Sequence, residues 1–335
     1  MVNYILMIPI LVSFFVTLFM IPSWIKRARK ANLLGKDINK FKKTELPEAG
    51  GVTVVTGFVL GSLLYIALNT FIFNTSENFI ELFALLSTIL LITFIAFVDD
   101  ILGWKIGLRK RTRLILVALA AIPLIVINAG ESEVGIPLLG TIDLGLIYPL
   151  IIIPIGIIGA TTTFNFLAGF NGLEAGQGIL LMFAVGIVAF FIGSPWLTII
   201  ALCMAAALLA FLLYNFYPAK VYPGDSLTYA VGGLIAIIAI LGNFEKIAVF
   251  FFIPYIIETG LKLRGKLVKQ SFGKPKKDGS LDLAYKKIYS LNHIAILLMK
   301  KLGWKATEKR VVYFIWGFQI LIIILGFIIF KNGIF

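Results

Sequence analysis

The chain has 335 residues, of which 60% are apolar or aromatic and only 14% are charged, with a mean hydropathy of +1.00. Soluble domains average about 45–50% apolar and about 25% charged residues, so this composition excludes a soluble enzyme and a disordered chain. The net charge is +13, while one Cys and one His exclude an internal disulfide and a multi-histidine metal site.

The apolar residues fall into long uncharged runs. The first run extends to Ile25 and is followed by basic residues, whereas a cleaved signal peptide carries its basic residues in front, so we expect a retained helix. A membrane crossing needs about 20 apolar residues, so the 45-residue run 175–219 must be two crossings, divided at residues 193–195. The sequence therefore predicts an all-α polytopic membrane protein, one integral-membrane domain over residues 1–335, with ten transmembrane helices in the runs 1–25, 50–76, 82–98, 114–130, 144–173, 175–219 (two), 226–244, 247–257 and 311–330.

The charges predict the orientation of these helices. If the helices alternate in direction, the five loops on one side hold 28 of the 30 Lys and Arg residues, and only Lys246 and Lys331 remain on the other. Because positively charged loops stay in the cytoplasm, we expect both termini outside and a cytoplasmic active site. The large positive charge is then a topology signal rather than a sign of nucleic-acid binding. The five loops are residues 23–49, 99–113, 164–178, 215–225 and 262–310.

Two loops show local patterns. The outer segment 131–143 is typical of a small hairpin. In the cytoplasmic loop 262–310, apolar residues from Leu281 to Leu302 repeat at helical spacing beside lysines, which predicts an amphipathic helix on the inner leaflet. We expect the single histidine, His293, on the polar face of that helix.

Adjacent acids end the third predicted helix. Asp99 and Asp100 repel each other and oppose the helix dipole, which favours cations at a C-terminus. Pairing with the nearby Arg109, Arg111 or Arg113 is one explanation. Because an ion pair needs only one acid, we favour a site for metal and phosphate at this helix end.

Two further polar clusters precede predicted helices on the same face. Residues 165–178 contain four glycines, which allow close backbone approach to a ligand, and Asn171, Glu174 and Gln177 offer oxygen donors to Mg²⁺ or a sugar. The alternative is an ordinary glycine-rich loop at a helix start. In residues 215–226, Asp225 follows Gly224 at the start of a helix, where a simple N-cap is the alternative.

These motifs together resemble those of the polyprenyl-phosphate N-acetylhexosamine-1-phosphate transferases, and most of all their eukaryotic and archaeal branch, which acts on UDP-GlcNAc and dolichyl phosphate. The resemblance spans most of the chain in family order. It rests on residues 35–40, 46–48, 99–100, 165–177 and 217–225.

The resemblance implies transfer of GlcNAc-1-phosphate from UDP-GlcNAc to a polyprenyl (dolichyl) phosphate, with release of UMP, as the first membrane step of glycan assembly. The implied cofactor is Mg²⁺, with Mn²⁺ as an alternative, and the partners are the two substrates and membrane lipids, with no nucleic acid and with a homodimer left open. The implied metal ligands are Asn171 and Asp225. The implied catalytic residues are Asp99, Asp100 and Arg113, the last standing where the family has a phosphate-binding Lys.

The resemblance also implies a set of substrate-binding residues. The His-containing basic motif of the last cytoplasmic loop is missing here, and its nearest basic substitutes are included in the set. These residues are Asp37, Asn39, Glu48, Asn165, Glu174, Gln177, Tyr222 (expected to stack on uracil), Arg264, Lys266, Lys269 and Lys274.

A nucleotide-sugar or anion transporter is the alternative function. It would also need many helices and a basic cytoplasmic face. It predicts charged residues at mid-bilayer along a pathway, whereas the centres of the predicted helices are nearly free of charge, and even Glu258 lies toward a helix end.

Overall fold

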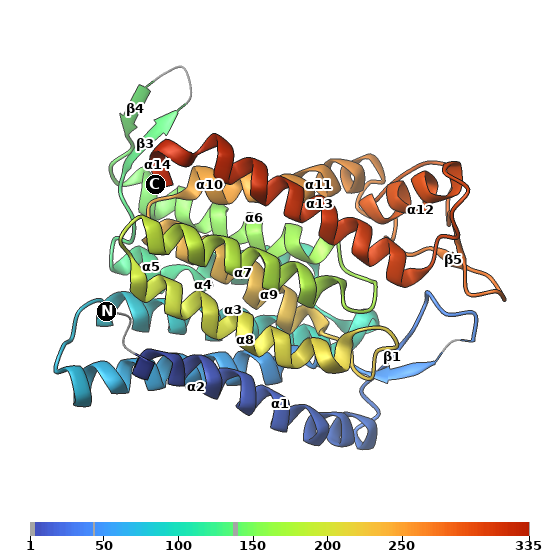
Figure 1. The fold of residues 1–335 in the computed structure, drawn as a ribbon, viewed down its shortest axis with the longest axis horizontal. Helices are drawn as coiled ribbons and strands as arrows, with labels where there is room; N and C mark the ends of the chain where they lie inside the picture. Colours follow the sequence, from blue (N-terminus) through green and yellow to red (C-terminus); the bar gives the residue numbers. More distant parts are fainter. Residues whose placement is uncertain (1–3, 43, 137–139, 335) are drawn as a thin grey trace.

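Long apolar helices run back and forth along one axis and form a single bundle (Figure 1). The computed structural model describes residues 4–42, 44–136 and 140–334. Its helices are α1 (Met7–Lys30), α2 (Gly51–Leu68), α3 (Phe79–Ile106), α4 (Lys110–Ala120), α5 (Ile122–Val126), α6 (Ile153–Phe166), α7 (Leu173–Phe191), α8 (Pro195–Asn215), α9 (Gly224–Leu241), α10 (Glu245–Phe251), α11 (Ile253–Arg264), α12 (Leu291–Lys301), α13 (Glu308–Ile329) and α14 (Lys331–Ile334).

Short additional elements flank these helices. A 3₁₀ turn at Tyr4–Leu6 precedes α1, and π-helical turns at Asn69–Phe73 and Tyr148–Ile152 extend α2 and α6. The strands form three antiparallel hairpins, β1 (Leu34–Lys36) with β2 (Glu45–Pro47), β3 (Glu133–Ile136) with β4 (Gly140–Asp143), and β5 (Lys274–Pro275) with β6 (Leu281–Asp282).

Eight helices in the described part of the chain are long and apolar enough to cross a membrane. This confirms the predicted all-α polytopic membrane protein, including the division of the 45-residue run, where α7 ends at Phe191 and α8 begins at Pro195. The eight spans are Tyr4–Lys30, Gly51–Phe73, Phe79–Gly103, Tyr148–Phe166, Leu173–Phe191, Pro195–Asn215, Gly224–Leu241 and Glu308–Ile329.

The other two predicted spans are broken helices. The first is interrupted at Ala121 between α4 and α5, next to Pro123, and the second at Phe252 between α10 and α11, next to Pro254. Proline cannot donate a backbone hydrogen bond and therefore interrupts a helix. With 17 and 20 residues, the two pairs are about 25 and 30 Å long at 1.5 Å per residue. Each is long enough to traverse most of the bundle, and ten crossings of the membrane stay a prediction.

The most buried helices lie at the centre of the bundle. Most side chains of α7 and α9 are buried, whereas those of α1 and α13 mostly face outward. The outward side chains are large and apolar; Phe19 and Phe94, for example, expose 73% and 65% of their surface. A continuous apolar exterior of this kind requires lipid around it.

The two ends of the bundle differ in what they carry. Figure 1 shows the start of α1, the short α14 and the hairpin β3–β4 at one end, with β1, β5 and α12 at the other. The predicted hairpin over residues 131–143 is confirmed, with Glu133 paired with Asp143 and Ile136 with Gly140; its tip, residues 137–139, lies outside the described residues. The described chain thus begins and ends at one end of the bundle, and the location of both termini outside stays a prediction.

The loop 262–310 differs from its prediction in two respects. The helix begins at Leu291 rather than near Leu281, because Leu281 pairs in β6 and the Ser290 side chain caps the helix by accepting from Asn292 N. The expectation for His293 was wrong, since its side chain is buried, with Nε2 3.0 Å from the carbonyl oxygen of Phe272. Contact of α12 with the inner leaflet stays a prediction.

The close packing of α1 on α2 provides a test of the fold. A Cβ on Gly61 would lie 1.9 Å from Ser13 Oγ and 2.6 Å from the carbonyl oxygen of Pro9, so the two helices can approach only because this side chain is absent. We expect Gly61→Ala to destabilise the protein by about 1–3 kcal/mol, the usual cost of overpacking. Thermal unfolding in detergent measures this. Gly159→Ala in α6 is the control, because a Cβ there meets no atom within 4 Å; equal stability of the two variants would contradict the close approach.

Candidate functional site

A polar cavity of about 1170 Å³ opens at the end of the bundle that carries β1 and β5. Helix ends and loops far apart in the sequence form its wall: the ends of α3 and α6, the starts of α4 and α9, the β1 hairpin and the segment after α11. Both signs of charge are present in this wall. The acidic residues lining it are Asp37, Glu48, Asp99, Asp100, Glu174 and Asp225, and the basic residues are Lys36, Arg113, Lys262 and Lys269.

The centre of the site is a guanidinium group shared by two carboxylates. Arg113 Nη1, from the first turns of α4, lies 2.8 Å from Asp99 Oδ2 and 2.5 Å from Asp225 Oδ2. Asp99 also accepts a 2.5 Å hydrogen bond from Leu108 N, and Asp225 accepts a 3.0 Å bond from Asn165 Nδ2. The structure therefore brings together the end of α3, the start of α4, the end of α6 and the start of α9, as the sequence clusters predicted.

Asp100 has a different partner from its neighbour Asp99. Its two carboxylate oxygens accept from Asp225 N at 2.7 Å and Ser226 N at 3.0 Å, which satisfies free N–H groups at the start of α9. Gly224 allows this contact, because its φ is +71° and a Cβ there would lie 2.5 Å from Asp100 Oδ2. Asp100 is thus the cap of α9 and positions Asp225, which was itself the expected N-cap under the alternative interpretation.

The donor set at Arg113 fits a divalent cation that is shared with phosphate. Oxygens of Asp99 and Asp225 converge on one cationic nitrogen, and Mg²⁺ is commonly held by one or two carboxylates together with substrate phosphates. In the residues that the structure describes, no group of three or more His, Cys, Asp and Glu is placed to hold a metal alone. A metal at this position would therefore depend on oxygens from a substrate.

Asn171, the second predicted metal ligand, lies in a neighbouring cluster. Its Nδ2 donates to Asp37 Oδ2 at 3.2 Å, and its backbone N–H donates to Glu308 Oε1 at 2.9 Å. Lys40 completes the cluster, with Nζ 2.5 Å from Glu308 Oε2. Asn171 is buried and is not among the described residues that line the cavity, whereas its partner Asp37 is, so its amide is engaged by Asp37. Glu308 and Lys40 were missed because nothing in the sequence links residues 268 positions apart.

Three of the predicted substrate-binding residues make hydrogen bonds that stabilise other segments. Of these three, only Glu174 also lines the cavity in the described part of the chain. Asn39 is buried, donates to the carbonyl oxygen of Gly169 at 2.7 Å and accepts from Gly273 N at 3.1 Å, so it joins three loops. Glu174 lines the cavity and accepts from Gly169 N at 2.7 Å. Gln177 is buried against α13, with Nε2 3.3 Å from the carbonyl oxygen of Ile315, and lies outside the described cavity wall.

Tyr222 and Glu48 lie where the prediction places them, in the cavity wall. Burial and the neighbouring Asp37 carboxylate, which accepts a hydrogen bond from the phenol, raise the pKa of Tyr222, so it stays protonated. Burial and the charge of Asp225 raise the pKa of Glu48. Tyr222 therefore brings a neutral hydroxyl group to the cavity wall.

Of the four basic residues proposed from the last loop, the cavity wall contains Lys269. Arg264, Lys266 and Lys274 are exposed and lie outside the described wall. Lys262 lines the cavity and was not predicted, because in the sequence it is one of many basic residues of the segment 262–310; in the structure it lies in α11. The basic contribution of this loop is thus Lys262 and Lys269.

Apolar helices around a charged cavity at one end define an integral membrane protein with a site for charged ligands. A model of glycosyl transferase family 4 matches residues 82–243. The chain is 36% identical over 326 residues to a protein of Saccharolobus solfataricus, covering 97% of this chain and 96% of the relative, which is provisionally named UDP-N-acetylglucosamine–dolichyl-phosphate N-acetylglucosaminephosphotransferase.

Two more distant relatives have related names. The chain is 31% identical over 276 residues to the UDP-N-acetylglucosamine–dolichyl-phosphate N-acetylglucosaminephosphotransferase of Dictyostelium discoideum, covering 71% of this chain and 66% of the relative. It is 29% identical over 291 residues to a phospho-N-acetylmuramoyl-pentapeptide-transferase of Halalkalibacterium halodurans, covering 80% and 87%. The chain belongs to the polyprenyl-phosphate N-acetylhexosamine-1-phosphate transferase superfamily, which confirms the resemblance found in its motifs.

The raised pKa of Glu48 gives a pH-dependent test of the site. A carboxyl group whose pKa is raised on folding favours the folded state most when it is protonated. Its contribution to the stability of the protein is therefore lost as the pH rises through the raised pKa. We expect Glu48→Gln to raise the thermal midpoint by about 2 °C at pH 8 and by less at pH 5. Thermal unfolding of both proteins at the two pH values measures this. A stabilisation by the substitution that is smaller at pH 8 than at pH 5 would contradict the prediction.

Proposed function

We propose that this protein transfers GlcNAc-1-phosphate from UDP-GlcNAc to a polyprenyl, most simply dolichyl, phosphate and releases UMP. The observation that carries the proposal is the convergence of Asp99 and Asp225 on Arg113 inside a cavity at the helix ends. Support for the substrates comes from the names of relatives that match nearly the whole chain or most of it. The proposed reaction is the first membrane step of glycan assembly.

The place of the cavity suits a reaction between a lipid and a soluble nucleotide. A polyprenyl chain stays in the bilayer, so its phosphate is presented at the headgroup level, while UDP-GlcNAc arrives from water. A site at the ends of membrane helices is where the two can meet. The five segments predicted on one face hold 28 of the 30 Lys and Arg residues, and all five contribute to the cavity wall, so we propose that this face is cytoplasmic.

The chemistry asks the protein mainly to reduce repulsion between two anionic substrates and to align them. Arg113 is suited to this, since a guanidinium binds phosphate oxygens in a two-pronged geometry, and Lys262 and Lys269 add positive charge to the wall. Mg²⁺, which Asp99 and Asp225 would hold, would neutralise phosphate charge when bound. Tyr222, which lines the cavity and has a protonated phenol, would pack against the uracil ring.

Asp99 is proposed to orient the lipid phosphate rather than to act as an obligatory base. Phosphate monoesters have a second pKa of about 6, so the lipid phosphate is largely a dianion at neutral pH and needs no deprotonation. Asp99 is also held on two sides, by Arg113 and by Leu108 N, which fixes its direction.

The test of the proposed function is an assay of the purified protein in detergent with UDP-GlcNAc, polyprenyl phosphate and Mg²⁺. We expect UMP release that requires both the lipid and the metal, and a panel of UDP-sugars then defines the sugar. Uptake of UDP-GlcNAc into proteoliposomes without UMP release would instead favour a transporter and would contradict the proposal.

Substitution of Arg113 tests the central contact. We expect Arg113→Gln to lower kcat by about 10²-fold or more, because the group that offsets phosphate charge is lost and Asp99 and Asp225 are left without their shared counter-ion. Arg113→Lys keeps the charge and should retain more activity than Arg113→Gln. Turnover with UDP-GlcNAc measures this, and equal activity of the two variants would contradict a role for the charge.

The pH profile of Asp99→Asn tests its role as an orienting group. An orienting role predicts that the rate falls by a similar factor, about tenfold, at every pH between 6 and 9. A base role predicts instead that the native rate falls on the acidic side and that the variant loses this dependence. Initial rates across that range, with Glu133→Gln in the distal hairpin as a control, distinguish the two results.

A further inference from the structure

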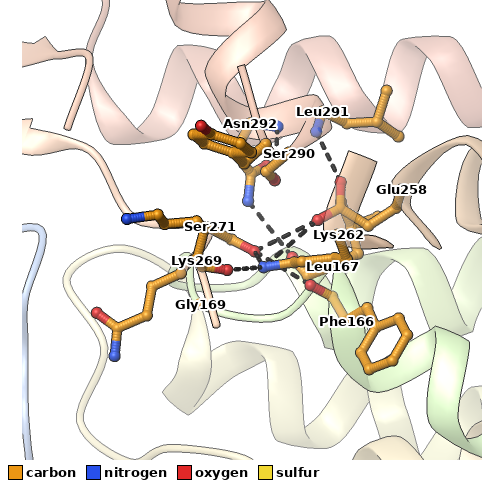
Figure 2. Close-up of polar contacts among 12 residues, drawn as sticks. Phe166, Leu167, Gly169, Glu258, Lys262, Lys269, Ser271, Ser290, Leu291 and Asn292 are labelled. Atoms are coloured by element: carbon orange, nitrogen blue, oxygen red, sulfur yellow. Dashed lines mark hydrogen bonds and ion pairs between the residues drawn. The ribbon is translucent and has the colours of Figure 1, made fainter. Parts of the chain in front are cut away.

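A buried polar cluster (Figure 2) adjoins the cavity, and its members Lys262, Lys269 and Ser271 line the cavity wall. It forms where α11, the segment 265–273 and the start of α12 meet, and its charged members are Glu258 and Lys262, one turn apart on α11. Glu258 is completely buried and Lys262 is 8% exposed. Two charges are rarely buried without a function or a full set of partners.

Lys262 supports the neighbouring part of the cavity wall. Its Nζ donates to Ser271 Oγ at 2.5 Å and to the carbonyl oxygen of Lys269 at 3.1 Å, and both of these residues line the cavity. The segment needs such support, because Lys266 and Leu267 adopt left-handed backbone conformations with φ of 54° and 56°, which non-glycine residues rarely adopt. The ammonium group thus fixes a strained segment at the point where it enters the cavity.

Glu258 balances this charge and connects the cluster to α12. Its Oε2 accepts from Leu291 N at 2.6 Å, the first residue of α12, while Oε1 lies 3.7 Å from Lys262 Nζ. Figure 2 shows its carboxylate between the two groups. Oε1 also lies 3.4 Å from Ser271 Oγ, a longer contact than the 2.5 Å bond that this hydroxyl accepts from Lys262 Nζ. Glu258 is therefore mainly a counter-ion for Lys262 and a cap for α12.

The cluster also reaches the central site. Ser271 Oγ donates to the carbonyl oxygen of Phe166 at 3.1 Å, and Asn292 Nδ2 donates to that of Leu167 at 3.4 Å, both at the end of α6. Asn165, which holds Asp225, precedes them directly. The wall that carries Lys269 is consequently tied to the helix that positions the carboxylate at Arg113.

We propose that Lys262 is a positioning residue that sets the wall segment 269–272, so that Lys269 faces the diphosphate of the nucleotide-sugar substrate, and that Glu258 serves as its buried counter-ion. This inference rests on the proposed function for the identity of the substrate. Lys262 then has two roles. Its hydrogen bonds to the wall segment govern substrate binding, and its pairing with the buried charge of Glu258 governs the stability of the protein.

Three variants distinguish these roles. Lys262→Met removes the donors and leaves Glu258 without a counter-ion, so both thermal stability and the KM for UDP-GlcNAc should deteriorate, the KM by about tenfold. The double variant Glu258→Gln, Lys262→Met also removes the carboxylate that Lys262→Met leaves unpaired. Its thermal stability should recover, while its KM for UDP-GlcNAc stays raised. Glu258→Gln alone should lower stability but leave the KM within about twofold of the native value.

Kinetics, thermal unfolding and hydrogen exchange of residues 266–273 are measured on the same samples. Exchange in this segment should be faster in both variants that lack Lys262 and unchanged in Lys287→Met, an exposed control in the same loop. A normal KM and normal exchange in the double variant, or a KM that follows stability in all three variants, would overturn the inference. If the native protein releases no UMP, the proposed function fails, and hydrogen exchange still tests whether Lys262 positions the segment.

Discussion

The contact between Arg113 and the two carboxylates of Asp99 and Asp225 is the interaction on which the geometry of the site depends. Each of the three groups comes from a different helix, and each helix brings its own neighbours to the cavity. Close placement of two carboxylates is unfavourable unless a cation lies between them. The guanidinium supplies that cation in the protein alone, and the same arrangement of charges suits a metal and phosphate in a complex with substrates.

Adjacent aspartates can do different work because successive residues on a helix point in directions about 100° apart. Asp99 faces Arg113 and the cavity, while Asp100 turns toward the start of α9 and accepts from two of its free N–H groups. The pair looks redundant in the sequence. In the structure one member contacts Arg113 and the other fixes the helix from which Asp225 projects.

The sequence predicted the parts of the structure that depend on composition and local pattern. The helices, the break at residues 193–195 and the meeting of Asp99, Asp100, Arg113 and Asp225 follow from apolar runs and from polar residues at helix ends. Asn171 and Gln177 show the limit of such reasoning, because their amides have partners on other segments, Asp37 and the carbonyl oxygen of Ile315. The burial of His293 and Lys262 likewise depends on tertiary packing that helical periodicity does not encode.

The presence of six acidic residues in the cavity wall has a physical explanation in the direction of the surrounding helices. The helices α4, α7, α9 and α13 all begin near the cavity, and three of them carry an acid in the first turn, Glu174, Asp225 and Glu308. Helix N-termini are positive, so these acids are favourable there before any ligand binds. Glu174 and Glu308 are further engaged by backbone N–H groups of the glycine-rich loop. Part of the negative charge near the cavity is thus offset within the protein by helix N-termini and backbone N–H groups, in addition to the charge of Arg113 between Asp99 and Asp225.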